Sequence, residues 1–530
     1  MPGISQESGG AAPAALAPDQ PSAPHPPVPG SVINRIVSGP PAPGHQITFA
    51  ALGGVTAMPL TELHDQAELL AIALRADGIK PGDRIGILAA NRVEWVLLDL
   101  AALRLGAVTA GFEPAKFDPD PGLLASYDLA VLFTDREPAP EKGIRPITDV
   151  PALIAGANPA CGLPPVEYGP ADVTTIKFTS GSTGQPKGLA ATAGSIDASI
   201  NAVQQMFSHG TAPDNTGDNI FIFLPLSLLQ QRYWVYSALA FGHDVTISSY
   251  EAAFAMMRRT NPTVVMGVPA FFETAKKHLE SRATDAAGLR TAAEALFGRQ
   301  IRYLWTGSAP ARQSVLRFFT SLGLPIYEGY GLNETCIVTK NYPGAHREGS
   351  VGKVLSGKKV LLDADGVISV HSEHPVSWRY EYAAPGESER VFAPDGTVRT
   401  GDLGYLDEDG FLFIRGRADD VIVLDNGKKI IVRPLEEFLK ASRAIEEAVI
   451  FCPVQTYLVA VVSPAASPPD ADAIYERLAQ CNASFSRDEQ IKELVIATER
   501  FSIENGLLTS QFKPRRQRIS DKYAGQIKGQ

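Results

Sequence analysis

Residues 179–188 form a glycine-rich segment with the composition of a phosphate-binding loop. The segment reads Thr-Ser-Gly-Ser-Thr-Gly-Gln-Pro-Lys-Gly. Glycines allow backbone N–H groups to come close to a polyanion, while hydroxyl groups and a lysine add donors and a positive charge. A Walker A loop is excluded, because it has four residues between its glycines and a serine or threonine directly after its lysine. The residues expected to contact phosphate are Thr179, Ser180, Gly181, Ser182, Thr183, Gly184 and Lys187.

The residues before this loop favour a binding site over a flexible surface connection. Short stretches rich in glycine and serine are often only mobile loops. Residues 173–178, however, read Val-Thr-Thr-Ile-Lys-Phe and have the β-branched and aromatic composition of a strand. A strand that leads directly into a glycine-rich loop is the arrangement expected of a phosphate site.

Helices and strands are expected to alternate around this loop. Apolar residues at helical spacing predict a helix from Leu60 to Leu74 and another over residues 93–105. Buried strands are expected at residues 84–88, 107–110, 221–224, 244–247, 263–266 and 301–305. This order predicts an α/β fold with layered, largely parallel sheets. Near residue 400 the pattern changes to short strands and turns, which indicates a small α+β domain toward the C-terminus.

The composition is that of a soluble globular protein with several domains. The chain has 530 residues, of which 45% are hydrophobic and 20% are charged. Its formal net charge of −10 argues against nucleic acid or an anionic membrane as the main partner. No apolar stretch approaches the roughly 20 residues that span a bilayer, so no integral membrane segment is expected.

Cysteine usage and the N-terminal residues indicate a cytoplasmic protein. The four cysteines are scattered and form no CxxC pair, which fits neither a zinc site nor a disulfide framework and suits a reducing compartment. The N-terminus lacks the basic start and the apolar core of a secretory signal. Residues 1–32 are rich in proline and alanine, and we expect them to form a disordered leader.

Three further segments contain residue types suited to nucleotide chemistry. Residues 327–335 read Tyr-Glu-Gly-Tyr-Gly-Leu-Asn-Glu-Thr, residues 399–404 read Arg-Thr-Gly-Asp-Leu-Gly, and residues 415–420 read Arg-Gly-Arg-Ala-Asp-Asp. Each segment alone has an ordinary explanation, such as a tight turn or a hairpin. The order of these three segments, their separations and the preceding 179–188 loop together favour a functional explanation over separate turns and hairpins.

In this order, the four segments resemble those of the adenylate-forming superfamily, which contains acyl-CoA synthetases, stand-alone adenylation domains and enzymes similar to firefly luciferase. The resemblance covers residues 33–525. Its closest branch is the long-chain acyl-CoA synthetases, because of residues 223–227 (Phe-Leu-Pro-Leu-Ser) with Arg232, residues 267–273 and residues 504–509.

The resemblance implies two domains joined by a hinge. Residues 33–417 would form a large N-terminal adenylation domain of layered α/β sheets, and residues 418–530 a small, mobile α+β domain. Asp419 occupies the hinge position of the family. In relatives the small domain rotates about this point after adenylation, which withdraws a catalytic lysine and presents a second face for acyl transfer.

The resemblance also implies an ATP site. The adenine would lie along residues 307–309 and stack on Tyr330. Asp402 would accept hydrogen bonds from the ribose hydroxyls, and Arg417 would assist it. Outside the loop, the residues expected to contact the nucleotide are Gly307, Ser308, Ala309, Glu328, Gly329, Tyr330, Gly331, Asp402 and Arg417.

The implied catalytic residues are Lys513, Asn333 and Glu334. Lys513 would bridge the attacking oxyanion and the α-phosphate and offset their growing charge, although it could also belong to a solvated basic tail with the arginines that follow it. Glu334, with Thr183, would hold Mg²⁺, a hard cation that prefers oxygen ligands. Asn333 stands where relatives usually have threonine or serine, and its amide can still donate a hydrogen bond to the α-phosphate.

Departures from the family pattern concern the acid that is activated. Leu228 stands where many relatives have histidine or an aromatic residue, and residues 375–382 read Pro-Val-Ser-Trp-Arg-Tyr-Glu-Tyr in place of the usual glycine–tyrosine turn. Strand alternation places Trp305 on the same face as Gly307. Trp305 then either projects toward the acyl pocket and restricts it to a short or aromatic acid, or packs in the core.

The resemblance implies an ATP-dependent ligase that activates a small organic acid as acyl-AMP, releases pyrophosphate and transfers the acyl group to a thiol. Coenzyme A is the expected acceptor, with a separate carrier protein as an alternative. A second hypothesis is a diazotase-type enzyme that adenylates nitrite for diazo or N–N bond formation with an amine. An amino-acid-activating domain is disfavoured, because residues 226–230 contain no acid to anchor an amine. A non-catalytic nucleotide binder is disfavoured by Glu334, Asp402 and Lys513.

Overall fold

The computed structural model describes the chain from residue 30 to residue 527 with seven short gaps. The described residues are 30–114, 116–137, 143–179, 186–208, 217–426, 428–453, 456–509 and 512–527. The fold begins at helix α1 (Val32–Ser38), where the Ser31 hydroxyl accepts a 3.1 Å hydrogen bond from the Asn34 N–H. This start differs from the leader boundary expected after residue 32, because Ser31 caps the helix and Val32 is completely buried.

The first large sheet has six strands in the order β6-β5-β3-β4-β7-β8. Neighbouring strands are parallel except for β7 and β8, which form an antiparallel hairpin. The strands expected at residues 84–88 and 173–178 are confirmed as β3 and β7. The bounds are β3 (Arg84–Leu88), β4 (Val108–Phe112), β5 (Leu129–Thr134), β6 (Ile144–Pro146), β7 (Val173–Thr179) and β8 (Lys187–Thr192).

The second large sheet has nine strands in the order β15-β14-β13-β12-β11-β9-β10-β1-β2. Its central strands are parallel, and β2, β14 and β15 at its two edges pair antiparallel. The bounds are β1 (Gln46–Ala51), β2 (Gly54–Pro59), β9 (Asn219–Ile222), β10 (Asp244–Ser248), β11 (Val264–Gly267), β12 (Tyr303–Thr306), β13 (Ile326–Leu332), β14 (Cys336–Lys340) and β15 (Lys353–Val354).

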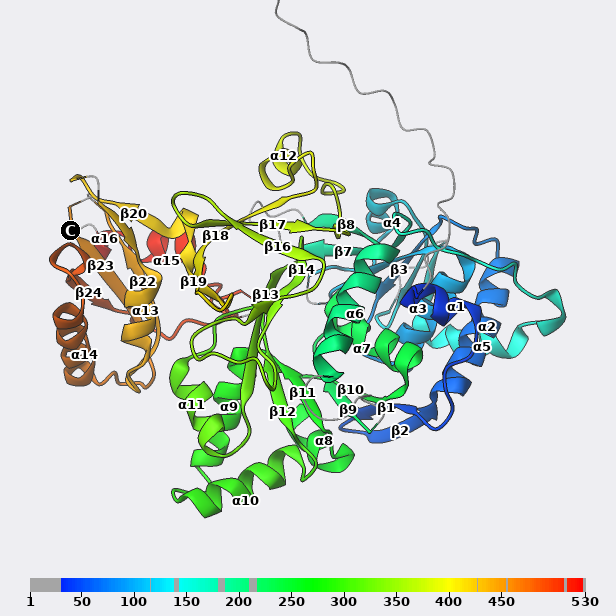
Figure 1. The fold of residues 1–530 in the computed structure, drawn as a ribbon, viewed down its shortest axis with the longest axis horizontal. Coiled ribbons are helices and arrows are strands. Elements are labelled where there is room, and N and C mark those ends of the chain that lie inside the picture. The colour runs from blue at the N-terminus through cyan, green and yellow to red at the C-terminus, as the bar shows by residue number, and fades with distance from the viewer. Residues whose placement is uncertain are drawn as a thin grey trace, which may run out of the picture.

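Helices pack against both sheets (Figure 1). The two helices expected near residues 60–74 and 93–105 are confirmed as α2 and α3. Helix α3 is apolar around most of its circumference, which is typical of a buried helix. Ten of its thirteen residues are buried. The bounds are α2 (Leu60–Ala76), α3 (Val93–Leu105), α4 (Pro121–Tyr127), α5 (Val150–Gly156), α6 (Ala193–Ser208), α7 (Leu229–Ser237), α8 (Ala253–Thr260), α9 (Pro269–Glu280), α10 (Ala286–Phe297) and α11 (Gln313–Ser321).

One buried apolar cluster connects the two large sheets. It contains Ile87 and Phe133 from the six-stranded sheet, Ile220 and Trp305 from the nine-stranded sheet, and Trp234 from α7. The shared core fixes the two sheets relative to each other. The strand ends that carry candidate site residues are therefore held on a rigid framework.

A four-stranded antiparallel sheet in the order β16-β17-β18-β19 packs on the edge of the nine-stranded sheet. Its apolar side chains, including Ile368 and Leu412, form a cluster with Val338 of β14. The bounds are β16 (Lys358–Leu362), β17 (Val367–Ser372), β18 (Val398–Leu406) and β19 (Leu412–Arg417), with the short helix α12 (Glu387–Val391) before β18.

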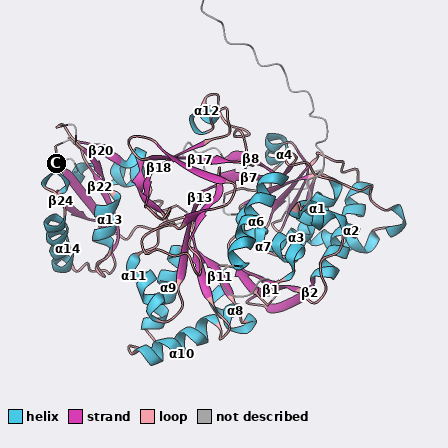
Figure 2. Cartoon of the chain, in the orientation of Figure 1, coloured by secondary structure: helices cyan, strands magenta, loops and turns pink. Residues whose placement is uncertain are grey.

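The C-terminal part is a small α+β unit, at the left of the views in Figures 1 and 2. It has a hairpin, β20-β21, a three-stranded sheet, β22-β23-β24, and a separate apolar core that includes Leu435 and Leu458. The bounds are β20 (Val421–Val423), β21 (Lys429–Ile431), β22 (Ile445–Phe451), β23 (Leu458–Pro464), β24 (Ile491–Ile496), α13 (Arg433–Lys440), α14 (Ala471–Ser484), α15 (Arg516–Lys522) and α16 (Ala524–Ile527). The large layered α/β part and the small α+β part confirm the expected fold class. Among the residues described, none of the helices is long and apolar enough to cross a bilayer.

Candidate active site

A cavity of about 1170 Å³ lies between the nine-stranded sheet and the C-terminal part. One wall comes from residues that follow the carboxyl ends of β9, β10, β11 and β12: Leu224, Leu228, Tyr250, Val268, Ser308 and Ala309. The facing wall includes Arg433, Glu436, Lys440, Lys513 and Arg516. Ligands of open α/β sheets bind outside the carboxyl ends of the strands, so the cavity lies where such a fold places its ligand.

The turn between β13 and β14 depends on a glycine. A Cβ atom added to Gly331 would come within 1.9 Å of the carbonyl oxygen of Cys336, so a side chain does not fit at this position. The close approach lets the chain reverse over Asn333 and Glu334 and return as β14. Two of the three expected catalytic residues are thus held in a tight turn at the carboxyl end of β13.

Tyr330, Asp402 and Arg417, three of the expected nucleotide residues, lie in direct contact. The Tyr330 hydroxyl donates a 2.6 Å hydrogen bond to Oδ2 of Asp402, and Nη1 of Arg417 donates a 3.0 Å bond to Oδ1. Asp402 and Arg417 are register partners on β18 and β19, which explains their pairing. Burial, reinforced by the charge of Asp402, raises the pKa of Tyr330 far above its ordinary value, so its hydroxyl stays protonated as a donor.

The expected adenine segment follows β12 directly. Ser308 has a left-handed backbone with φ of 69°, which is uncommon for a residue with a side chain. Ser308 and Ala309 line the cavity, and a Cβ atom added to Gly307 would lie 3.5 Å from the carbonyl oxygen of Gly329. The segment therefore follows a strand that pairs directly with β13, the strand that carries Tyr330.

Glu334 provides the carboxylate expected to hold Mg²⁺. Its Oε1 accepts a 2.7 Å hydrogen bond from the Tyr380 hydroxyl, and its second oxygen makes no hydrogen bond to any residue that the structure describes. The described residues contain no group of three or more His, Cys, Asp or Glu side chains that could enclose a metal. One carboxylate, completed by phosphate oxygens and water, is a donor set that fits Mg²⁺, which keeps several water ligands and binds with substrate phosphates.

The glycine-rich loop is described only at its two ends. Ser180, Gly181, Ser182, Thr183 and Gly184 lie outside the described residues. Thr179 and Lys187 are register partners at the end of the β7–β8 hairpin. Nζ of Lys187 lies 3.0 Å from Oε1 of Glu387 in α12, so a carboxylate of the chain itself pairs with the expected phosphate-binding lysine.

Lys513 lies in the cavity wall and is electrostatically coupled to the Asp402–Arg417 pair. Burial lowers the pKa of Lys513, and the charge of Asp402 acts in the opposite direction. The Lys513 side chain is solvent-accessible and lines the cavity, whose wall partly desolvates the ammonium group. The Thr509 N–H donates a 2.8 Å hydrogen bond to the Lys513 carbonyl.

Glu328 is buried behind the nucleotide residues. Its Oε1 accepts a 3.3 Å hydrogen bond from the Ala311 N–H, and burial raises its pKa to about 7. Lys340 on the adjacent strand is also buried, which lowers its pKa to about 7. Each charge partly offsets the cost of burying the other. Sequence reasoning did not single out Lys340, because a lysine at this position of a strand carries no sign of its burial.

The two expected substrate-pocket residues have different environments. Leu228 lines the cavity. Trp305 is only 2% exposed and packs in the core, where its ring lies 5.5 Å from that of Trp234 and 4.4 Å from Nζ of Lys340. Asp419, expected at the hinge, is exposed in the short turn between β19 and β20, with its Oδ2 3.4 Å from Nη2 of Arg417.

Tyr380 and Glu387 contact expected site residues but were missed by sequence reasoning. Both lie in the segment that precedes β18, and Tyr380 falls within residues 375–382, where the sequence departs from the family pattern. That departure was the available signal. The contacts themselves, to Glu334 and Lys187, join residues far apart in the chain and could not be inferred from spacing.

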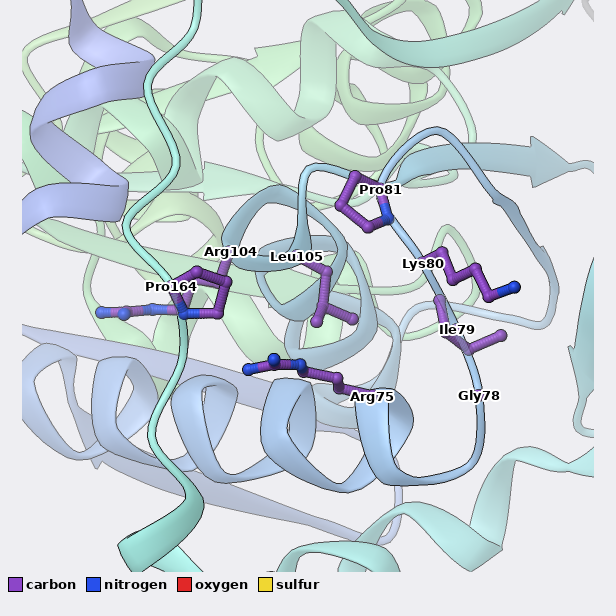
Figure 3. A pocket seen from close by; sticks show the side chains of 8 residues that line it. All are labelled: Arg75, Gly78, Ile79, Lys80, Pro81, Arg104, Leu105 and Pro164. Atoms are coloured by element: carbon purple, nitrogen blue, oxygen red, sulfur yellow. The ribbon is translucent and has the colours of Figure 1, made fainter.

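A smaller hollow of about 250 Å³ lies at the C-terminal ends of α2 and α3 (Figure 3). Its lining residues are Arg75, Gly78, Ile79, Lys80, Pro81, Arg104, Leu105 and Pro164. The expected nucleotide, catalytic and pocket residues that the structure describes are all absent from this lining. The larger cavity is the candidate active site, because Leu228, Ser308, Ala309 and Lys513 line it. Tyr330, Asp402, Arg417, Asn333 and Glu334 are not among its lining residues.

The fold and this site define a two-domain adenylate-forming enzyme. The family model described as AMP-binding enzyme matches residues 47–373, and the model of the AMP-binding enzyme C-terminal domain matches residues 419–530. Because the first match covers more than half of the chain, the protein belongs to the AMP-binding enzyme family. The resemblance inferred from the sequence motifs is thus confirmed.

Relatives in sequence are CoA ligases. The long-chain-fatty-acid–CoA ligase FadD15 of Mycobacterium bovis is 29% identical over 575 residues, which cover 92% of this chain and 94% of that protein. FadD13 of Mycobacterium tuberculosis, also a long-chain-fatty-acid–CoA ligase, is 25% identical and covers 74% of this chain and 80% of its own. These relatives agree with the expected acid-activating function and give the nitrite hypothesis no support.

Solved structures show the same fold. ATP-bound MatB from Rhodopseudomonas palustris has a TM-score of 0.76 at 20% identity and covers 93% of this chain and 99% of its own. The o-succinylbenzoate CoA synthetase MenE from Bacillus subtilis, in complex with the acyl-adenylate OSB-AMP, has a TM-score of 0.73 at 21% identity. The match covers 94% of this chain and 99% of MenE.

Proposed function

We propose that the protein is an ATP-dependent, AMP-forming ligase that activates a carboxylic acid and transfers the acyl group to coenzyme A. The observation that carries this proposal is the position of Lys513. It faces the cavity that Ser308 and Ala309 line, within electrostatic range of the Asp402–Arg417 pair. A preorganised cation beside a nucleotide site is suited to stabilise charge that develops at phosphorus.

In the first half-reaction, a carboxylate oxygen of the acid attacks the α-phosphorus of ATP. A new O–P bond forms as the bond to pyrophosphate breaks. Asp402 and Arg417 hold the ribose, Tyr330 supports the adenine, and Lys513 offsets the negative charge of the pentavalent phosphorus. The 179–188 loop, through Lys187, receives the departing pyrophosphate.

The metal requirement of this half-reaction rests on Glu334. When bound, Mg²⁺ supplies charge neutralisation at the phosphates. Glu334 would provide its carboxylate ligand and Thr183 a hydroxyl contact. Asn333, in the same turn as Glu334, would donate its amide N–H to the α-phosphate.

In the second half-reaction, the thiol sulfur of coenzyme A attacks the acyl carbonyl carbon, AMP leaves and the thiol proton is released. We place the domain boundary between residues 417 and 418 and the hinge at Asp419, whose exposed side chain lies in the turn between the two parts. Asp419→Pro is expected to preserve pyrophosphate release and to block the consumption of coenzyme A. Equal slowing of both half-reactions would contradict the hinge.

The acid is proposed to have an apolar body. The cavity wall beside Leu228 contains Phe223, Leu224 and Val268, and the sequence relatives are named as fatty-acid ligases. A carrier protein bearing a thiol is a second acceptor that the same chemistry would serve. All four cysteines are free thiols, which supports function in the cytoplasm.

Pyrophosphate release across a panel of fatty acids, aryl acids, amino acids and nitrite tests this function. We expect pyrophosphate release only with fatty or aryl acids. Coenzyme A should then be consumed and AMP should form. Release that depends on an amino acid and does not consume coenzyme A would reject the ligase assignment.

A further inference from the structure

Tyr380 connects two parts of the phosphate site that come from different sheets. Its hydroxyl donates a 2.7 Å hydrogen bond to Oε1 of Glu334 in the β13–β14 turn. Its ring centroid lies 5.1 Å from Nζ of Lys187 at the start of β8, within range of a cation–π interaction. One side chain therefore contacts both the expected metal ligand and the expected phosphate-binding lysine.

The backbone around Tyr380 is fixed by contacts on both sides. The Tyr380 N–H donates a 2.9 Å hydrogen bond to the Ser388 hydroxyl, and the ring packs edge-on against Phe392 at 5.1 Å. The next residue, Glu381, exchanges two backbone hydrogen bonds with Gly188, at 2.9 and 2.8 Å. The segment is thus tied to the base of the glycine-rich loop, and the orientation of Tyr380 is set before any ligand binds.

The Tyr380 hydroxyl is the donor in its hydrogen bond to the Glu334 carboxylate. Lys187 pairs with Glu387 at 3.0 Å, so its charge is balanced in the protein alone. A protonated phenol that donates to one carboxylate oxygen leaves the other oxygen for a ligand.

We propose that Tyr380 is a positioning residue of the metal–phosphate site, which orients Glu334 through its hydroxyl and Lys187 through its ring. The proposal rests on the proposed ligase function. Hydrogen-bond partners of metal ligands fix ligand geometry, and their loss typically costs about 10–100-fold in metal affinity. The hydroxyl and the ring therefore have separable effects, the first on Mg²⁺ and the second on the phosphates.

Binding measurements with the full chain separate these effects. Tyr380→Phe keeps the ring and removes the hydroxyl. We expect the Mg²⁺ affinity of the enzyme–ATP complex, measured by calorimetry, to fall by about 10–100-fold, while ATP binding in EDTA is unchanged. Tyr382→Phe is the matched control, because its hydroxyl accepts a 2.6 Å hydrogen bond from Arg84 on the far side of the same segment.

Two further variants make the result decisive. In a Glu334→Gln background, Tyr380→Phe is expected to cause no additional loss of Mg²⁺ affinity, because both changes act on one ligand. Tyr380→Leu is expected also to weaken pyrophosphate binding severalfold, since it removes the ring beside Lys187. The proposal would be overturned if Tyr380→Phe left the Mg²⁺ affinity unchanged. It would also be overturned if Tyr380→Phe lowered the Mg²⁺ affinity equally in the wild-type protein and in the Glu334→Gln variant.

The same experiment distinguishes failure of this proposal from failure of the proposed function. If the wild-type protein binds ATP with Mg²⁺ but activates no acid, the ligase function is rejected while the Tyr380 comparison still decides its role. If the protein binds no ATP in the presence of Mg²⁺, both proposals are rejected.

Discussion

Tyr330 and Asp402 are joined by a 2.6 Å hydrogen bond although 72 residues separate them in the sequence. Tyr330 belongs to β13 of the nine-stranded sheet, and Asp402 belongs to β18 of the four-stranded sheet. The bond therefore links the two sheets at the candidate nucleotide site. It also orients the Asp402 carboxylate, which Arg417 contacts from the adjacent strand.

Asp402→Asn is expected to raise the KM for ATP by about 10–100-fold, because hydrogen bonds to a charged group contribute about 1.5–3 kcal/mol. The value of kcat is expected to change less, since the interaction is made with bound substrate as well as with the transition state. Steady-state pyrophosphate release at varied ATP measures both. Asp409→Asn, at an exposed position after the same strand, is the control, and an unchanged KM in Asp402→Asn would contradict the ribose role.

Lys513→Ala is expected to lower the rate of pyrophosphate release by about 10²–10³-fold, the usual cost of removing one preorganised electrostatic group. ATP binding measured by calorimetry should remain close to that of the wild type, because other residues hold the nucleotide. Lys492→Ala removes an exposed lysine of the same C-terminal part and should have no effect. Release at the wild-type rate in Lys513→Ala would reject its catalytic role.

Arg312 connects the N-terminal part to the C-terminal part. In this arrangement of the two parts, Lys513 lines the cavity. Nε of Arg312 lies 3.1 Å from Oε1 of Glu273 in α9, and its Nη1 donates a 3.1 Å hydrogen bond to the carbonyl of Lys440. The other Nη donates to the carbonyl of Glu446. These contacts favour this arrangement of the two parts.

Arg312→Ala is therefore expected to slow pyrophosphate release about tenfold, as for a loss of about 1.4 kcal/mol. The conversion of preformed acyl-AMP with coenzyme A should be unaffected, since it uses the rotated arrangement. Arg317→Ala is the control, because Arg317 lies on α11, the helix that Arg312 precedes, and pairs with the exposed Glu348. Equal effects on the two half-reactions would show that Arg312 does not select between arrangements.

Lys177 is a buried cation whose removal is expected to stabilise the fold. It is 2% exposed, and its Nζ has no hydrogen-bond partner among the described residues. An unsatisfied buried polar group costs about 1–3 kcal/mol. Lys177→Met keeps the length of the side chain, so we expect it to raise the free energy of unfolding by a similar amount at pH 7. Urea denaturation measures this, with the exposed Lys492→Met as control.

The pH dependence provides a second test at Lys177. Burial lowers its pKa below the ordinary value of 10.5, so above the lowered pKa the unfolded chain binds more protons than the native protein. The stability contribution of Lys177 therefore rises as the pH increases toward 10.5. The Lys177→Met variant should lack this rise, and a variant less stable than the wild type at pH 7 would show that the ammonium group is stabilising.

Local sequence patterns predicted the framework of the fold and most of the candidate site. The strand at residues 173–178 and the helix at residues 93–105 follow from β-branched and apolar composition, and both are present. Asp402 and Arg417 were identified because the motifs that contain them, taken in order, resemble those of the adenylate-forming superfamily. Their direct contact then follows from the register of β18 and β19.

Long-range contacts account for what the sequence could not predict. Tyr380 contacts Glu334, 46 residues away, only because the four-stranded sheet packs on the edge of the nine-stranded sheet. The burial of Lys177 and Lys340 is likewise a consequence of tertiary packing, since propensity alone places a lysine of a strand at the surface. The burial of Trp305 is likewise a result of tertiary packing, because its ring packs against Trp234 from α7.

The central claim is that an acid is activated as an adenylate before it reaches a thiol. The most direct measurement is mass spectrometry of the wild-type protein mixed with ATP, Mg²⁺ and the best acid of the panel, first without and then with coenzyme A. We expect acyl-AMP and pyrophosphate to form in equal amounts in the first step, and acyl-AMP to disappear with equal formation of acyl-CoA and AMP in the second. Release of ADP and phosphate, or acyl-CoA formation without an acyl-AMP intermediate, would contradict the account.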